Sequence, residues 1–174
     1  PNLDRFAQGA VVFDNAYSPG SYTVPSFLSY MSSVAVRTHG WDYPFDVRFP
    51  KPGFCARADL TTLAEVLQES GFDNRAFVSN GLLHPKRGFP RGFETWNAFE
   101  VQGLASRELT KAQARFRDRE VVAKGIESME SWEPGERHFL YLHLMYPHLP
   151  HEPSRAVRKE LDLPDEPKRF STTD

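Results

Sequence analysis

The sequence predicts an α/β domain built on a mostly parallel sheet with helices on both faces. Amphipathic helical patterns alternate with short apolar runs along the 174 residues, which is the order found in parallel α/β folds. Hydrophobic residues make up 40% of the chain and charged residues 25%, a balance typical of folded globular proteins. The length suits one ordinary domain.

The chain opens with a predicted helix, strand and loop. Residues 1–9 favour a short helix because Pro1 suits a first turn and Gly9 suits the position after a helix end. The apolar run at residues 10–13 predicts a strand, and residues 14–20 predict a loop.

A second helix is predicted over residues 23–33. Phe27, Leu28 and Met31 would lie on one side of this helix and form its apolar face. Residues 34–54 hold three prolines and five aromatic residues. They predict an ordered but irregular segment.

A third helix and a second strand follow. Residues 62–71 predict a helix because Thr62 and Glu65 have the spacing of a capping box, in which each side chain binds the other residue's backbone amide. Residues 75–79 predict a strand. Residues 80–97 are rich in Gly, Pro and Arg and predict a loop.

The longest helical pattern runs over residues 105–132. Its expected apolar or small face consists of Ala112, Phe116, Val122, Ile126 and Met129. Residues 138–145 predict a buried strand because this run is mostly apolar. The Pro-rich, charged residues from 147 onward predict a loop or tail.

Charge and cysteine content exclude several classes of protein. Lys and Arg total 21 against 23 Asp and Glu, which gives a net charge of −2. This balance argues against a nucleic-acid-binding protein and against a polybasic membrane-surface protein. The single cysteine, Cys55, excludes an intramolecular disulfide and a cysteine-based zinc site. The sequence contains no apolar run of 18 residues, so we predict no membrane segment in this chain.

Ligands of open α/β sheets bind where strands end and helices begin. Two segments, residues 18–26 and 145–151, have that placement. Thr23 at the start of a helix would meet an anion such as a sulfate or phosphate group, and its hydroxyl would face the central atom. A threonine hydroxyl is a poor nucleophile, so a metal or base must activate it. The alternative is that Thr23 only caps the helix.

Histidines and basic residues supply further candidates. His148 lies in a stiff Pro-His-Leu-Pro turn and could protonate a leaving group or bind an oxyanion, or it could be a hydrogen-bonded turn histidine. His143 lies within the last predicted strand, where a hydrogen-bonded core histidine is the simpler interpretation. Lys86, Arg87 and Arg91 could attract an anionic substrate or form a solvated basic loop.

In this order, the segments resemble the N-terminal part of the sulfatase family, within the alkaline-phosphatase superfamily. The resemblance is carried by residues 1–18, Thr23-Val-Pro-Ser26 with His39-Gly40, residues 62–71, residues 76–80, Arg91-Gly-Phe-Glu94 and residues 139–153. It implies an alkaline-phosphatase-like α/β/α sandwich. It also implies a metal-dependent hydrolase of sulfate or phosphate esters, with an anionic ester as its partner.

The resemblance assigns roles to particular residues. Thr23 would be the nucleophile and the one metal ligand present, and His148 would bind the ester or assist the leaving group. Asn80, Lys86 and His143 would bind the substrate. The metal implied is a divalent cation, calcium first, with zinc, manganese and magnesium as alternatives.

Two positions depart from the family pattern. Sulfatases carry Cys or Ser, oxidised to formylglycine, where this chain has Thr23, and Arg where it has Phe27. Oxidation of threonine would give a ketone, whereas threonine is familiar as the nucleophile in relatives that act on phosphate esters. Two alternatives therefore stay open. One is a sulfatase-like binding or structural module without catalysis, and the other is a membrane-anchored phosphoethanolamine- or glycerophosphate-type transferase.

The resemblance also bears on domain content and location. Residues 1–174 would be a partial catalytic domain that lacks the first strand and the C-terminal part, where the family holds most of its metal ligands. We therefore expect these residues alone to be inactive. An extracytoplasmic location is implied, and the choice between sulfate and phosphate and the oligomeric state stay open.

Overall fold

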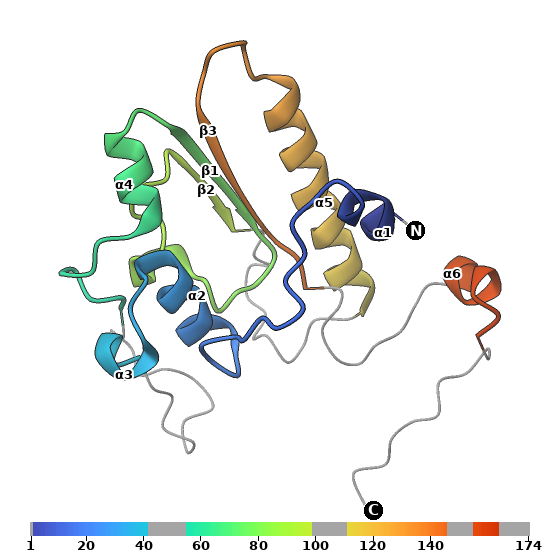
Figure 1. The fold of residues 1–174 in the computed structure, drawn as a ribbon, viewed down its shortest axis with the longest axis horizontal. Coiled ribbons are helices and arrows are strands. Elements are labelled where there is room, and N and C mark those ends of the chain that lie inside the picture. Colours follow the sequence, from blue (N-terminus) through green and yellow to red (C-terminus); the bar gives the residue numbers. More distant parts are fainter. Residues whose placement is uncertain (1, 42–54, 99–110, 146–154, 164–174) are drawn as a thin grey trace, which may run out of the picture. The chain divides into compact units, whose positions relative to one another are not determined.

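The computed structural model describes residues 2–41, 55–98, 111–145 and 155–163, and shows helices arranged with a small sheet (Figure 1). In chain order the elements are α1 (Asn2–Ala7), α2 (Thr23–Ser32), α3 (Val36–His39), α4 (Leu63–Glu69), β1 (Asp73–Val78), the 3-10 helix η1 (Pro85–Arg87), β2 (Thr95–Ala98), α5 (Lys111–Glu130), β3 (His138–His143) and α6 (Arg155–Glu160). Among the described residues, none of these helices combines the length and the apolar character needed to cross a membrane.

The three strands form one parallel sheet in the order β2-β1-β3. Asp73 N–H donates to the Arg137 carbonyl at 2.9 Å, and Ser79 N–H donates to the His143 carbonyl at 3.0 Å. Both pairs are offset by the same number of residues, which is the register of parallel neighbours. The ends of β1 and β3 therefore lie at the same edge of the sheet, as the sequence predicts.

Two compact units can be distinguished. The first comprises Pro1–Ala76, Leu82–Trp96 and Glu133–Leu140, and the second comprises Phe77–Gly81, Asn97–Trp132 and Tyr141–Asp174. The first unit has an aromatic core around Phe27, which is 2% exposed. Its ring meets those of Phe89 and Trp96 edge to face, at centroid distances of 5.5 and 6.1 Å.

The capping box predicted at the start of α4 is present. Glu65 N–H donates to Thr62 Oγ1 at 3.2 Å, and Thr62 N–H donates to Glu65 Oε2 at 2.8 Å. Two amides that the helix leaves without intrahelical partners are thereby satisfied, which fixes where α4 begins.

In the second unit, the buried side of α5 is not the predicted one. Val122, Ile126 and Met129 are 40–46% exposed. Among the described positions of α5, the buried residues are Arg117, Asp118, Val121, Gly125 and Ser128. The side chains of Ala112 and Phe116, also on the predicted face, lie outside the described part of the chain. A β-carbon added at Gly125 would lie 2.9 Å from Leu142 Cδ1, so the missing side chain lets α5 approach β3 closely. The hydrophobic pattern missed this side because its residues are small or polar.

Other element predictions differ from the structure in identifiable ways. The apolar residues 10–13 form no strand, and Val11 to Phe13 are 61–82% exposed. The third strand is instead β2, within the segment predicted as loop. The short helices α3 and α6 also lie in segments predicted as irregular. The helices expected near 1–9, 23–33 and 62–71 and the strands near 75–79 and 138–145 are confirmed, although β3 is half-buried rather than fully buried.

Candidate functional site

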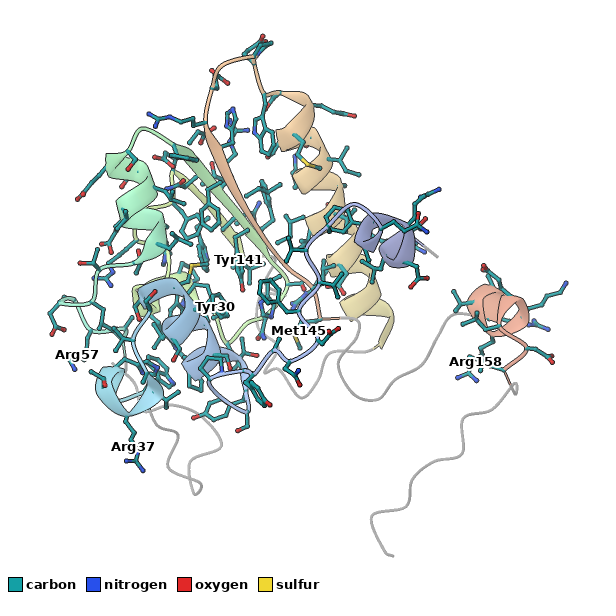
Figure 2. The ribbon with its side chains drawn as sticks, viewed as in Figure 1. Tyr30, Arg37, Arg57, Tyr141, Met145 and Arg158 are labelled. Carbon is teal, nitrogen blue, oxygen red and sulfur yellow. The ribbon has the colours of Figure 1, made fainter. Side chains whose placement is uncertain are left out.

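A cluster of polar side chains lies where β1 and β3 end. Ser79 and Asn80 directly follow β1, His143 is the last residue of β3, and Asp118 comes from α5. Ser79, Asn80 and Asp118 are 4–8% exposed. Tyr141 on β3 and Met145 beyond its end, both labelled in Figure 2, complete the cluster. We call these six residues the strand-end cluster.

Asp118 links the two strand ends. Its Oδ1 accepts hydrogen bonds from Ser79 Oγ at 2.6 Å and from Met145 N–H at 2.9 Å. The Ser79 hydroxyl also lies 2.9 Å from the His143 carbonyl, but it has a single hydrogen, and the carboxylate is the stronger acceptor. The Ser79 N–H donates to that carbonyl, which closes a ring of bonds.

His143 lies between two polar neighbours. Its Nε2 is 3.3 Å from Asn80 Nδ2, and its Nδ1 is 2.9 Å from Tyr141 Oη. An amide nitrogen only donates, so Nε2 is the acceptor and Nδ1 carries the proton that is donated to Tyr141. Burial lowers the pKa of His143 below its ordinary value, and the Asp118 carboxylate opposes this by raising it. The structure thus brings Asn80 and His143, two predicted substrate-binding residues, into contact.

Thr23 is the first residue of α2, at the position predicted for an anion-facing hydroxyl. The helix cap is Tyr22, whose side chain makes no capping bond, so the interpretation of Thr23 as the cap is wrong. Two serine hydroxyls stabilise the loop before α2. Ser18 Oγ and Ser26 Oγ both donate to the Gly20 carbonyl, at 2.7 and 2.9 Å. This loop therefore enters α2 in one conformation, with Thr23 half-buried.

The basic residues of the loop after β1 separate into two kinds. Lys86 lies exposed in η1, and its backbone N–H donates to His84 Nδ1 at 3.1 Å. Arg91 binds the carbonyls of Ala58 and Leu60 at 2.9 and 2.7 Å, so it braces the chain before α4. Arg91 therefore has a structural role. Substrate binding by Lys86 stays a prediction.

His148 lies outside the described residues, and its role in binding the ester or assisting the leaving group stays a prediction. Cys55 is exposed, with its thiol directed to the Lys86 carbonyl. The described part of the chain contains no group of three or more His, Cys, Asp or Glu side chains that could hold a metal ion.

Sequence reasoning missed Ser79 and Asp118. Ser79 is the last residue of the strand predicted over residues 75–79, and Asp118 lies within the helix predicted over residues 105–132 but outside its expected apolar or small face. The available signal for Ser79 was its place at a strand end beside Asn80. No local pattern indicates that Asp118 is buried.

Comparison with known proteins agrees with the predicted class. The fold is α/β with a parallel sheet, of the kind found in sulfatases and alkaline-phosphatase-like proteins. The sequence profile of the Sulfatase family matches residues 1–165, and the chain therefore belongs to that family. No curated protein matches the chain by sequence.

A solved structure has a similar fold. It is that of BT4656 in complex with its substrate D-glucosamine-2-N,6-O-disulfate. The match has a TM-score of 0.63 at 18% sequence identity and covers 97% of this chain. The chain spans 34% of the length of the matched structure.

Proposed function

We propose that the protein is a sulfuric ester hydrolase with Thr23 as its nucleophile. The observation that carries this proposal is the Sulfatase family match over residues 1–165. The position of Thr23 as the first residue of α2 supports it, because the amides at a helix N-terminus stabilise an anion placed before them.

The proposed chemistry is a transfer of the sulfuryl group in two steps. The Thr23 hydroxyl gives its proton to solvent and its oxygen attacks sulfur, while the bond between sulfur and the ester oxygen breaks and the leaving alcohol takes a proton from His148. Water then attacks the sulfur of the threonine sulfate, and the bond between sulfur and the Thr23 oxygen breaks. One proton of the water returns to the Thr23 oxygen, the other reprotonates His148, and sulfate leaves. In this scheme Lys86 and the amide group of Asn80 donate hydrogen bonds to the sulfuryl oxygens, Lys86 also offsets their negative charge, and His143 takes part through the hydrogen bond it accepts from Asn80.

Sulfate esters are favoured over phosphate esters by one comparison. The matched BT4656 structure holds a sulfated glucosamine as its substrate, so a sulfated sugar is the substrate class we propose. Metal dependence, with calcium as the first candidate, follows from family membership alone. An extracytoplasmic location is proposed on the same basis.

Turnover tests the proposal directly. The full-length gene product containing these residues is assayed with 4-nitrophenyl sulfate and 4-nitrophenyl phosphate, with calcium, magnesium, manganese or zinc added in turn. We expect sulfatase activity that falls at least about 10³-fold in Thr23→Val and is largely retained in Thr23→Ser, which keeps a hydroxyl. Activity that survives in Thr23→Val would remove Thr23 as nucleophile, and a strong preference for the phosphate ester would redirect the substrate class.

A binding module without catalysis is the second candidate, and one observation favours it. Phe27 stands where the family has an arginine, and its ring is buried between Tyr30, Phe89 and Trp96. This position thus contributes to the core and supplies no guanidinium to an anion. Sulfated sugar binding without turnover under every metal would support this candidate.

A further inference from the structure

We propose that Asp118 is a positioning residue that holds the Asn80–His143 pair in one geometry and one proton arrangement. The inference deepens the proposed function, on which it rests for the role of that pair. Asp118 itself comes from α5, outside the loops that follow the strands.

Hydrogen bonds connect Asp118 to the ends of both strands. Asp118 Oδ1 accepts one bond from the residue before Asn80, through the Ser79 hydroxyl, and one from the backbone two residues after His143, at Met145. The bond from Ser79 N–H to the His143 carbonyl completes the ring. Movement of either strand end breaks at least one bond of this ring, so the separation of Asn80 and His143 is held from both sides.

The side chains that form these hydrogen bonds are buried. Asp118 is 8% exposed and Ser79 4% exposed, so water cannot easily replace these hydrogen bonds if the carboxylate is removed. An unsatisfied buried donor costs about 1–3 kcal/mol. Without Asp118, the Ser79 hydroxyl could turn to the His143 carbonyl at 2.9 Å, but the Met145 amide would need a new partner, and the end of β3 would have to move to find one.

The neighbours of His143 determine which of its ring nitrogens carries the proton. The contact from Asn80 Nδ2 makes Nε2 the acceptor, which places the proton on Nδ1, facing Tyr141. A free imidazole exchanges its proton between the two nitrogens, so the single arrangement depends on Asn80 staying where the ring of bonds puts it. The carboxylate also favours the protonated ring electrostatically, since Asp118 opposes the lowering of the His143 pKa by burial.

The experiment uses the full-length gene product that contains these residues, labelled with ¹⁵N at histidine. Two-bond nitrogen–proton couplings report which ring nitrogen of His143 carries the proton, and a pH titration reports its pKa. His143→Gln serves only to assign the signals. The variants are Asp118→Ala, Asp118→Asn and Ser79→Ala, with Glu130→Gln as the control, because Glu130 is an exposed carboxylate on the same helix.

In the wild type and in Glu130→Gln, we expect the proton on Nδ1 of His143. Asp118→Asn keeps an oxygen acceptor, so the proton stays on Nδ1 while the pKa falls further below that of the wild type. Asp118→Ala and Ser79→Ala break the ring, so both lose the single proton arrangement. An Asp118→Ala chain that is folded and keeps the wild-type arrangement would overturn the proposal. If Asp118→Ala does not fold, an unchanged arrangement in Ser79→Ala overturns it instead.

Titration with sodium sulfate separates this proposal from the proposed function. If the variants behave as expected but sulfate leaves the His143 signals unmoved in the wild type, the positioning role stands and sulfate binding at this pair fails. If sulfate moves those signals while the variants leave the proton arrangement unchanged, the positioning role fails alone.

Discussion

Among the glycines that the structure describes, Gly92 is the one where substitution by alanine should destabilise the protein most. Gly92 has φ +79°, and a β-carbon on it would lie 2.7 Å from Glu65 Cα and closer still to the Glu65 nitrogen and the Ala64 carbonyl carbon. These are backbone atoms at the start of α4, so no flexible side chain can move aside. Asn74 Nδ2 also holds the Gly92 loop against α4, because it donates to the carbonyls of Gly92 and Ala64, at 2.6 and 2.7 Å.

The magnitude has two parts. Alanine at positive φ costs about 1–2 kcal/mol, and forcing a methyl group into packed backbone costs about 1–3 kcal/mol more. The sum, roughly 2–5 kcal/mol, is a large share of the usual 5–15 kcal/mol stability of a domain. At about 2–4 °C per kcal/mol, the melting temperature should fall by roughly 4–20 °C.

Gly40→Ala is the matched control. Gly40 also has positive φ, +69°, but no atom of the described residues lies within 4 Å of its added β-carbon. It should therefore show the conformational cost alone, about 1–2 kcal/mol. Chemical denaturation of both variants, followed by circular dichroism, gives the two free energies of unfolding. Equal losses in the two variants would refute the close approach of Gly92 to α4.

Three further predictions concern buried polar groups and the catalytic assignment. Asn74→Ala should destabilise the protein by about 1–3 kcal/mol for each carbonyl it leaves without a donor; a loss below about 0.5 kcal/mol in denaturant unfolding would contradict the bridging role of Asn74 between α4 and the Gly92 loop. Stability should fall as the pH drops below about 6.5, because burial lowers the pKa values of His39 and His143 in the folded state and the unfolded chain then binds more protons. The free energy of unfolding, measured from pH 7.5 to 5, should therefore rise with pH by up to about 1.4 kcal/mol per pH unit for each histidine. A flat profile would argue against burial of neutral imidazole rings. In the full-length gene product, His148→Ala should lower turnover per folded molecule by about 10²–10⁴ if His148 is the proton donor, whereas a structural turn histidine would lower only stability.

The acid sensitivity expected at His39 has a visible structural cause. His39 is 3% exposed. Trp41 N–H donates to its Nδ1 at 3.0 Å, and its Nε2 lies 3.0 Å from Ser29 Oγ. A backbone amide can only donate, so Nδ1 must stay unprotonated and the ring must stay neutral. Protonation breaks the bond to Trp41, which is why the folded state resists it.

Local signals explain what the sequence could predict of the fold. The box formed by Thr62 and Glu65 defines the start of α4 through contacts three residues apart. The apolar runs around β1 and β3 are long enough to indicate strands without knowledge of their neighbours. Residues 10–13 show where this reasoning fails, because an apolar run becomes a strand only when another strand pairs with it.

Nonlocal contacts explain what the sequence could not predict. Strand β2 lies in a segment full of turn-forming residues, and the adjoining Glu94 is anchored by residues far away in the chain: its amide donates to the Asn74 carbonyl at 3.0 Å, and its carboxylate accepts from Asn74 N–H at 2.7 Å. The motif Arg91-Gly-Phe-Glu94, which the sequence singled out, is therefore a structural connection to β1 and α4. The charge of Arg91 is compatible with anion binding, but charge alone does not reveal which carbonyls a guanidinium will reach.

The choice of an acidic residue at position 118 follows from what the strand ends require. Two donors, a hydroxyl and a backbone amide, converge on one oxygen, and an asparagine oxygen could accept both bonds. A charged acceptor strengthens such bonds, from about 0.5–1.5 to about 1.5–3 kcal/mol each. It also acts against the burial that lowers the pKa of His143, and thus keeps the ring easier to protonate near neutral pH. One buried carboxylate therefore serves both the geometry and the charge of the predicted substrate-binding pair, whereas an apolar residue of the same size could serve neither.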